Sequence, residues 1–163
     1  MDPVHFTGKE VLDMAIKIEE NGLRYYADAA KASRNERLKE VFKVLANEEC
    51  DHIRVFSELK KTLADKDYQA GFDAYADEAA LYISAIADTE VFTNPGKGRD
   101  LARQVKDEKD AVRTALDMEK DSLLFYYEIL KMIREKDRDV VENLIEQEKS
   151  HVKKLTELQK CLP

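Results

Sequence analysis

The chain lacks most of the residues that build loop-rich or disulfide-linked proteins. Its 163 residues include 5 glycines, 3 prolines and no tryptophan. So few glycines and prolines leave few tight turns, which argues against an all-β sandwich or barrel. The only two cysteines, Cys50 and Cys161, exclude a framework of several disulfides. We expect both thiols to be reduced, as in cytoplasmic proteins.

Several functional classes also lack their usual signals. The absence of a Cys-x-x-Cys pair excludes a four-cysteine site of the rubredoxin or structural zinc kind. The net charge of −7, with Lys and Arg interleaved among Glu and Asp, argues against a nucleic-acid partner. Neither the residues after Met1 nor any other stretch forms an apolar run long enough for a signal peptide or a bilayer span. We therefore expect a cytoplasmic protein with no membrane partner.

The chain is rich in charged residues and in apolar residues that recur with the periodicity of an α-helix. Charged residues make up 37% and hydrophobic residues 44%, a balance typical of long amphipathic helices. Apolar residues recur at alternating steps of three and four along four long segments. Short links within 7–63 and within 107–162 predict two antiparallel helical hairpins, with a long crossover at 64–106.

The predicted crossover has two parts. Aromatic and aliphatic residues between Tyr68 and Ile86 predict a shorter helix packed on the bundle, and Thr93 to Gly98 form a cluster of helix breakers. Two hairpins joined by a long crossover are the ferritin-like arrangement of four helices. The sequence therefore predicts an all-α, ferritin-like four-helix bundle that forms a single domain over residues 1–163.

The two predicted hairpins repeat each other at an offset of about a hundred residues. The matching segments are 15–19 with 115–119, 25–26 with 125–126, 49–53 with 148–152, and 57–59 with 156–158. A repeat of this length predicts two related hairpins packed about a pseudo-two-fold axis.

Each predicted helix has an apolar stripe that is interrupted near its middle, either by one Glu or by a Glu and a His one turn apart. In the first helix the stripe is Leu12, Ile16, Glu19, Leu23, Tyr26 and Ala30. Across the four helices the interrupting residues are Glu19, Glu49, His52, Glu119, Glu148 and His151. Four buried carboxylates with no Lys or Arg in these stripes would repel one another strongly. Two divalent cations would balance their charge, so the pattern predicts a two-metal site formed by all six residues.

The ligand types indicate which metal the site prefers. Carboxylate-rich sites with one imidazole per metal favour iron over zinc or copper, and manganese is the second choice. We therefore expect two iron ions. His5 lies outside the predicted helices, and we interpret it as a surface residue.

Two tyrosines lie two turns beyond the single Glu ligands of their stripes, at Tyr26 and Tyr126. Their hydroxyls either donate to ligand carboxylates across the bundle or belong to aromatic side chains that only fill the core. Glu48 and Gln147 each precede a Glu ligand; they either hold a histidine ring or, as we favour, lie on a solvated face. Cys50 points away from its neighbour Glu49, so we expect a packed or partly exposed thiol.

The residues around these positions resemble the rubrerythrin group of ferritin-like proteins. The motifs that carry the resemblance are Glu19-x-x-Gly22-x-x-Tyr25-Tyr26, Glu119-x-x-Ser122-x-x-Phe125-Tyr126, Glu49-x-x-His52 and Glu148-x-x-His151. The resemblance covers essentially the whole chain. It implies a di-iron centre that reacts with peroxide or dioxygen.

The chain departs from the rubrerythrin pattern in two ways. It lacks a rubredoxin-like domain, which implies a separate rubredoxin-like electron donor. Ser122 stands where rubrerythrins carry a further Glu, so the ligand set is more symmetric and resembles a bacterioferritin ferroxidase centre.

Four functions remain open at this point. They are a peroxide- or dioxygen-reducing oxidoreductase of oxidative-stress defence, a ferroxidase or iron-handling protein, an oxygenase acting on an organic substrate, and a non-enzymatic helical module. We favour the first, in a homodimer.

Overall fold

The computed structural model describes residues 8–62, 85, 94 and 96–162. The elements of this part of the chain are α1 (Gly8–Ala32), α2 (Glu36–Thr62), α5 (Lys97–Gln104), α6 (Glu108–Met132), the short 3₁₀ helix η1 (Glu135–Asp137) and α7 (Arg138–Cys161). The predicted all-α fold is confirmed. The predicted helix between Tyr68 and Ile86 lies, apart from Ala85, outside the described residues, as does His5. The single-domain assignment stays a prediction.

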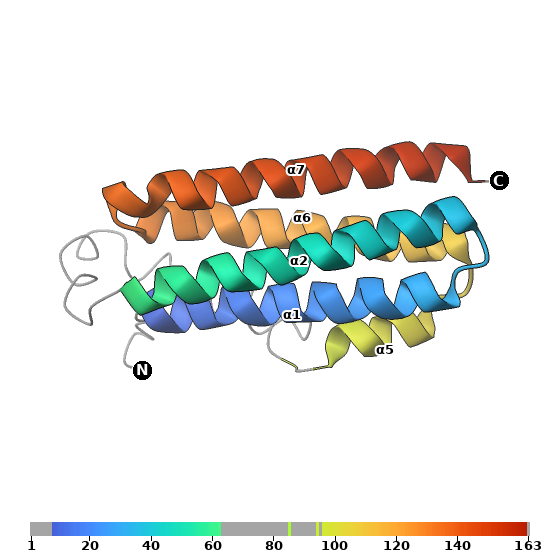
Figure 1. Cartoon of the computed structure of the whole chain (residues 1–163), viewed down its shortest axis with the longest axis horizontal. Coiled ribbons are helices and arrows are strands. Elements are labelled where there is room, and N and C mark those ends of the chain that lie inside the picture. Colours follow the sequence, from blue (N-terminus) through green and yellow to red (C-terminus); the bar gives the residue numbers. More distant parts are fainter. Residues whose placement is uncertain (1–7, 63–84, 86–93, 95, 163) are drawn as a thin grey trace.

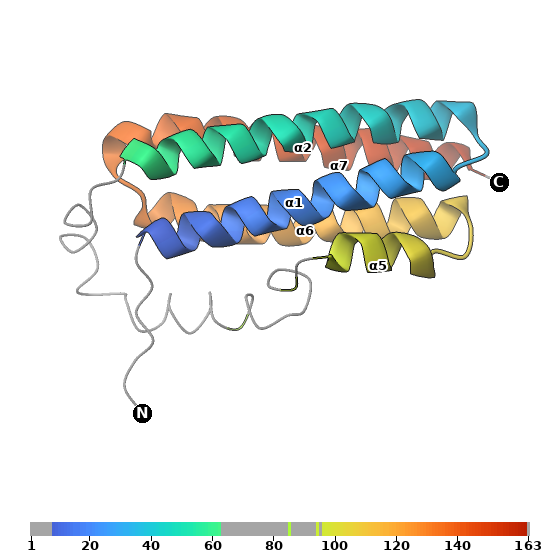
Figure 2. The same ribbon diagram turned by 60° about the horizontal axis from the view of Figure 1, so that its bottom comes forward.

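Four long helices lie side by side as two antiparallel hairpins (Figure 1). The α1–α2 turn and the α6–α7 turn lie at opposite ends of the bundle, so α1 also runs antiparallel to α6, and α2 to α7 (Figure 2). Helix α5 packs along α1 on the outside of the bundle. This arrangement brings the middles of all four long helices to a common level.

Side-chain caps at one end join the two hairpins. Asn35 Oδ1 accepts a hydrogen bond from the Leu38 N–H at 3.1 Å, which satisfies a free amide at the start of α2. Glu108 Oε1 accepts hydrogen bonds from the Asn35 N–H at 2.8 Å and the Ser33 hydroxyl at 3.2 Å. Because Glu108 begins α6, this carboxylate ties the second hairpin to the turn of the first.

Helix α5 begins inside the predicted cluster of helix breakers. Asn21 of α1 accepts hydrogen bonds from the N–H groups of Gly96 and Gly98 at 3.3 and 3.4 Å, and donates to the Asn94 carbonyl at 3.3 Å. Gly96 has a φ of 111°, and a Cβ on Gly98 would lie 1.9 Å from the Asn21 carbonyl oxygen. The glycines thus allow a turn and a close helix contact, and the second role was not predicted.

The buried core consists of two apolar clusters, one toward each end of the bundle. The cluster near the α6–α7 turn includes Phe56, Ile129 and Leu144. The cluster near the α1–α2 turn includes Phe42, Leu45 and Leu155. Buried polar residues occupy the level between them, which is where the candidate site lies.

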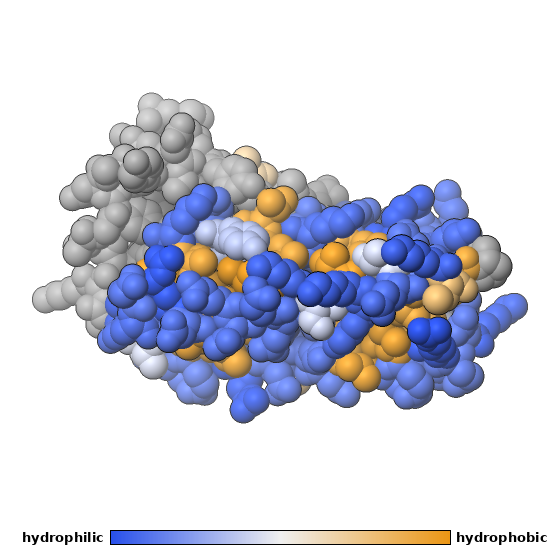
Figure 3. All heavy atoms as spheres, turned by 90° about the horizontal axis from the view of Figure 1, so that it is seen from above, coloured by the Kyte–Doolittle hydropathy of each residue, from blue (hydrophilic) through white to orange (hydrophobic). Residues whose placement is uncertain are grey.

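The face of the bundle along which α7 runs is mostly hydrophilic (Figure 3). Figure 3 looks onto the side along which α7 runs and shows hydrophobic side chains only in patches between polar ones. Many surface charges pair with a residue three positions away, as Lys149 does with Glu146 at 2.6 Å. Such exposed pairs contribute little to stability. None of the helices in the described part of the chain has the length and apolarity needed to cross a membrane.

Candidate metal centre

The structure brings together the six residues that the sequence singled out. Helix α1 carries Glu19, α2 carries Glu49 and His52, α6 carries Glu119, and α7 carries Glu148 and His151. Each is at most 3% exposed. Glu-x-x-His spacing places both side chains one turn apart on the same helix face. The antiparallel packing then turns all six toward the bundle axis.

Two overlapping groups of ligand atoms result. The first contains Glu19, Glu49, His52 and Glu148, and the second contains Glu49, Glu119, Glu148 and His151. Within each group, one ligand atom per residue lies within 4.8 Å of the others. Glu49 and Glu148 belong to both groups, so they are placed to bridge two metal ions.

The two shared carboxylates each present one oxygen to each imidazole. Glu148 Oε1 lies 2.8 Å from His52 Nδ1, and its Oε2 lies 3.1 Å from His151 Nδ1. Glu49 Oε2 lies 3.7 Å from His52 Nδ1, and its Oε1 lies 3.4 Å from His151 Nδ1. The two rings stack with centroids 5.6 Å apart. Both Nδ1 atoms therefore face the shared carboxylates.

Several of these buried atoms have no hydrogen-bond partner within the described residues. They are Glu49 Oε1, both Glu148 carboxylate oxygens, His52 Nδ1 and both ring nitrogens of His151. Burying a polar atom without a partner costs free energy, and a bound metal ion would supply the missing partner. Carboxylate oxygen and neutral imidazole nitrogen are good ligands for divalent transition metals. The residues present therefore fit a two-metal centre.

The four carboxylates differ in their affinity for protons. Burial and the neighbouring Glu19 and Glu148 carboxylates raise the pKa of Glu49 well above its usual range. Burial and the Glu148 carboxylate raise the pKa of Glu119 to about 8. Burial also opposes ionisation of Glu19 and Glu148, but close polar contacts with neighbouring side chains outweigh it and lower the pKa of both. Two carboxyl groups thus hold a proton and two are ionised.

The histidines hold protons as well. Burial alone would lower their pKa values, because it disfavours a charged imidazolium. Contacts with Glu148 and Glu19 outweigh burial and raise the pKa of His52 strongly, while Glu119 and Glu148 raise the pKa of His151 to about 12. Two imidazolium groups therefore balance two carboxylates in the metal-free protein. Metal ions would displace these protons, since they bind the deprotonated ligands.

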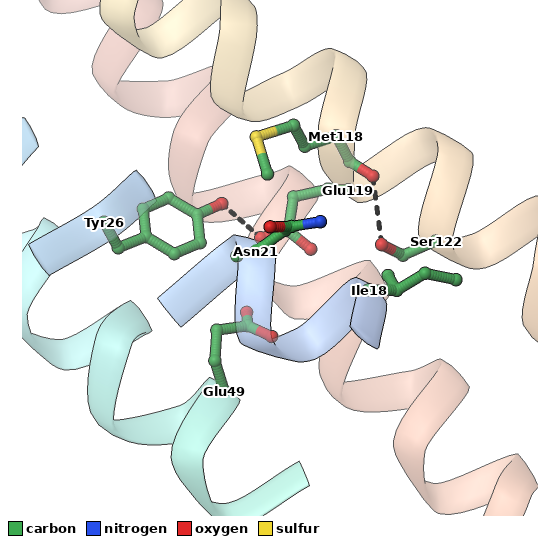
Figure 4. Close-up of a pocket in the computed structure, with 8 residues that line it drawn as sticks. Ile18, Asn21, Tyr26, Glu49, Met118, Glu119 and Ser122 are labelled. Carbon is green, nitrogen blue, oxygen red and sulfur yellow. Dashed lines mark hydrogen bonds between the residues drawn. The ribbon is translucent and has the colours of Figure 1, made fainter. Parts of the chain in front are cut away.

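The tyrosines Tyr26 and Tyr126 form reciprocal hydrogen bonds across the two hairpins. The Tyr26 hydroxyl of α1 donates to Glu119 Oε1 of α6 (Figure 4), and the Tyr126 hydroxyl of α6 donates to Glu19 Oε1 of α1. Of the two interpretations left open, the structure shows the hydrogen-bonded one. Burial and the nearby carboxylates raise the pKa of both hydroxyls, so both remain donors.

Glu48 and Gln147 combine the two roles considered for them. Gln147 is exposed, yet its Oε1 lies 3.0 Å from His52 Nε2 and is hydrogen-bonded to it. The Glu48 side chain is 35% exposed, and its Oε2 lies 3.1 Å from His151 Nε2. Lys154, which the sequence did not single out, donates to both Glu48 oxygens at 3.0 and 3.1 Å. Cys50 and Cys161 are both free and exposed.

A small cavity reaches the carboxylates from between α1 and α6 (Figure 4). Its volume is about 10 Å³, about enough for the centre of one water-sized molecule. The lining residues are Ile18, Asn21, Gly22, Tyr26, Glu49, Met118, Glu119 and Ser122. The Ser122 hydroxyl donates to the Met118 carbonyl at 3.0 Å, so it does not point to the ligand atoms. Asn21 and Gly22 were not predicted to line the site.

An all-α bundle with a central layer of Glu and His from four helices defines the class of carboxylate di-metal proteins. The family model described as Rubrerythrin matches residues 10–159. The chain therefore belongs to the rubrerythrin family, which confirms the resemblance seen in its motifs.

A solved structure supports the fold. A protein from Thermotoga maritima, described as a ferritin-like diiron-carboxylate protein, is 23% identical to this chain with a TM-score of 0.67, and the match covers 96% of each chain. The ferritin-like bundle is thereby confirmed. A comparison with curated proteins found no match.

Proposed function

We propose that this chain is a non-haem di-iron redox protein that reduces peroxide or dioxygen. The observation that carries the proposal is the pair of overlapping ligand groups that share Glu49 and Glu148. Shared carboxylates hold two metal ions close together, as two-electron chemistry on one small molecule requires. Family membership supports the same assignment.

The donor set supports iron as the metal. Each ligand group offers three carboxylates and one imidazole, a hard ligand set suited to iron or manganese. When bound, two Fe(II) ions would supply one electron each to an oxidant. The chain itself contributes the buried position of the six ligands, and the Tyr26 and Tyr126 hydroxyls that orient Glu119 and Glu19.

The small cavity supports an oxidant of peroxide or dioxygen size. Its volume of about 10 Å³ suits a molecule close to water in size and is far too small for an organic substrate. This observation favours reduction of a small oxidant over an oxygenase that acts on an organic molecule. We propose a rubredoxin-like protein as the electron donor for repeated turnover.

The test is anaerobic loading with two Fe(II) per chain, followed by hydrogen peroxide or air. We expect rapid oxidation of iron, seen by visible absorption, and repeated peroxide consumption when reduced rubredoxin is added. Protein loaded with redox-inactive Zn(II) is the control and should consume no peroxide. Fewer than two ions per chain, or no reaction beyond that of free iron, would contradict the proposal.

A ferroxidase is the second candidate, because Ser122 supplies no additional carboxylate to either ligand group. The two groups are then matched in composition, as in a centre whose substrate is Fe(II) itself. Two measurements distinguish the ferroxidase from the peroxide-reducing enzyme: the fate of excess Fe(II) added to the protein, and the size of the assembly in solution. A many-subunit cage that stores oxidised iron favours the ferroxidase, whereas a dimer with peroxide turnover favours the redox enzyme.

A further inference from the structure

The two histidines of the centre differ in what their outward-facing nitrogens contact. His52 Nε2 is hydrogen-bonded to the amide oxygen of Gln147 at 3.0 Å. His151 Nε2 faces the carboxylate of Glu48, with Oε2 at 3.1 Å. His151 Nε2 has no hydrogen-bond partner within the described residues, so this second contact is electrostatic. Gln147 and Glu48 hold corresponding places in the internal repeat, so the repeat is broken here.

An imidazole that binds a metal through Nδ1 keeps its proton on Nε2. The acceptor of that proton fixes the ring orientation and tunes the donor strength of Nδ1. The carboxylate of Glu48 is negatively charged and lies 3.1 Å from Nε2, so it attracts the Nε2–H group more strongly than the neutral amide oxygen of Gln147 does. His151 therefore has the stronger outer partner and should be the better ligand.

Lys154 contacts both oxygens of Glu48, but the atom that faces His151 Nε2 is the carboxylate oxygen Oε2. The ligands themselves do not explain the difference, because each group holds three Glu and one His. The contrast that remains is the chemical nature of the acceptor behind each ring.

We propose that Glu48 and Gln147 make the two metal positions unequal, so that the position beside His151 binds a divalent cation first. Glu48 is then a positioning residue that acts through His151. Outer partners of histidine ligands typically change metal affinity by about 10- to 100-fold. We expect the His151 position to bind about 10-fold more tightly than the His52 position. This inference rests on the metal centre proposed above.

The test uses the three histidines of the chain as reporters. Metal-free protein labelled with ¹⁵N-histidine is titrated with Zn(II), a diamagnetic ion that binds carboxylate and imidazole. At one equivalent, the ring nitrogens of His151 should shift in the NMR spectrum while those of His52 remain largely unchanged. At two equivalents both rings should shift. Mutual repulsion of two ions cannot mimic this result, because it does not decide which position fills first.

Two exchange variants test the cause. In Glu48→Gln both rings should respond equally at one equivalent, because both then face an amide. In the double variant Glu48→Gln and Gln147→Glu, His52 should respond first. Glu146→Gln removes an exposed carboxylate on α7 that pairs with Lys149 and should leave the wild-type order unchanged.

The outcomes separate this inference from the proposed function. Two bound Zn(II) ions that fill both positions equally in the wild type would overturn the inference and leave the metal centre intact. The inference would also be overturned if His151 still responded to Zn(II) before His52 in the double variant. A protein that binds no Zn(II) would overturn both.

Discussion

The two hairpins of this bundle carry the same ligands in different surroundings. Hairpin α1–α2 offers Glu19 and a Glu-x-x-His pair, and hairpin α6–α7 offers Glu119 and an identical pair. Next to the ligands the hairpins diverge. Gly22 of α1 corresponds to Ser122 of α6, and a Cβ at Gly22 would lie 3.3 Å from the Glu49 carboxyl carbon. The direct ligands are thus repeated in both hairpins, whereas the residues next to them differ.

The largest expected effect comes from removing the carboxylates that belong to both ligand groups. Replacing Glu49 and Glu148 together by Ala should abolish binding of two ions per chain, because each group then keeps one Glu and one His. Replacing Glu19 alone by Ala leaves the His151 group complete and should retain one tightly bound ion. Elemental analysis after gel filtration measures the stoichiometry. Two ions retained by the double variant would refute the bridging assignment.

The second effect is pH dependence of metal affinity at the His151 position. The raised pKa values of Glu119, about 8, and His151, about 12, mean that both groups hold a proton near pH 6. A metal ion must displace both, together with the proton on Glu49, whose pKa is also raised. Affinity should therefore rise about tenfold per pH unit for each proton released, or about 1000-fold from pH 6 to pH 7. Competition titrations with a chelator at these two pH values measure the slope. A pH-independent affinity would contradict this proton count.

Stability of the metal-free protein should change with pH in the opposite direction. The pKa of Glu119 is raised from its ordinary value of 4.5 and that of His151 from 6.5. Their contribution to stability is full below the ordinary values and declines as pH rises toward the folded-state pKa. Between pH 6.5 and 8 the folded state still holds a proton on each group that the unfolded state has released. The free energy of unfolding should therefore fall by about 1.4 kcal/mol per pH unit for each group. Urea unfolding at several pH values tests the sign, and a rise in stability would contradict it.

The tyrosine pair should reveal a smaller difference between the hairpins. In the metal-free protein Tyr126 donates to Glu19, whose pKa is lowered, whereas Tyr26 donates to Glu119, whose pKa is raised. A hydrogen bond to a charged group contributes about 1.5–3 kcal/mol and a neutral one about 1 kcal/mol. Tyr126→Phe should therefore lower the free energy of unfolding more than Tyr26→Phe. With metal bound, both acceptors are ionised and the difference should shrink.

The smallest expected effect concerns a position where only one hairpin has a hydroxyl. Tyr25 donates to the Ala111 carbonyl at 2.6 Å, and its counterpart in the repeat is Phe125. Tyr25→Phe should cost about 1 kcal/mol of unfolding free energy, measured by urea denaturation. Metal stoichiometry serves as the control and should stay unchanged. A large loss of bound metal would show that this hydroxyl supports the centre.

The sequence predicted the parts of the molecule that follow from periodicity and charge. The apolar stripes predicted the four long helices, and the interruptions in those stripes identified the six residues that lie together at the centre of the bundle. The stripe of α1 was less accurate in detail. Ile16 and Leu23 are only partly buried, whereas Ala15 and Tyr25 are fully buried. A helix in a bundle touches two neighbours, so its buried face is wider than a seam with steps of three and four.

The features that the sequence did not predict depend on side-chain conformation and on contacts between helices, not on the spacing of residues along one helix. Lys154 could not be assigned, because a lysine on a helix surface has many accessible rotamers and usually meets only water. Asn21 is 2% exposed and holds the start of α5, but a polar residue two positions after Glu19 gives no clear pattern. The contacts of Glu48 and Gln147 also depend on the axial alignment of α2 and α7, which local sequence does not specify.

The reciprocal bonds of Tyr26 and Tyr126 have a consequence for how the hairpins dock. Leucine side chains would tolerate a slide of α1 along α6 by one helical turn, about 5.4 Å, because one leucine can take the place of another. The same slide would part both hydroxyls from Glu119 and Glu19 and push a carboxylate into an apolar cluster. The polar layer thus penalises misaligned docking of the hairpins, so a single register is selected before any metal ion arrives.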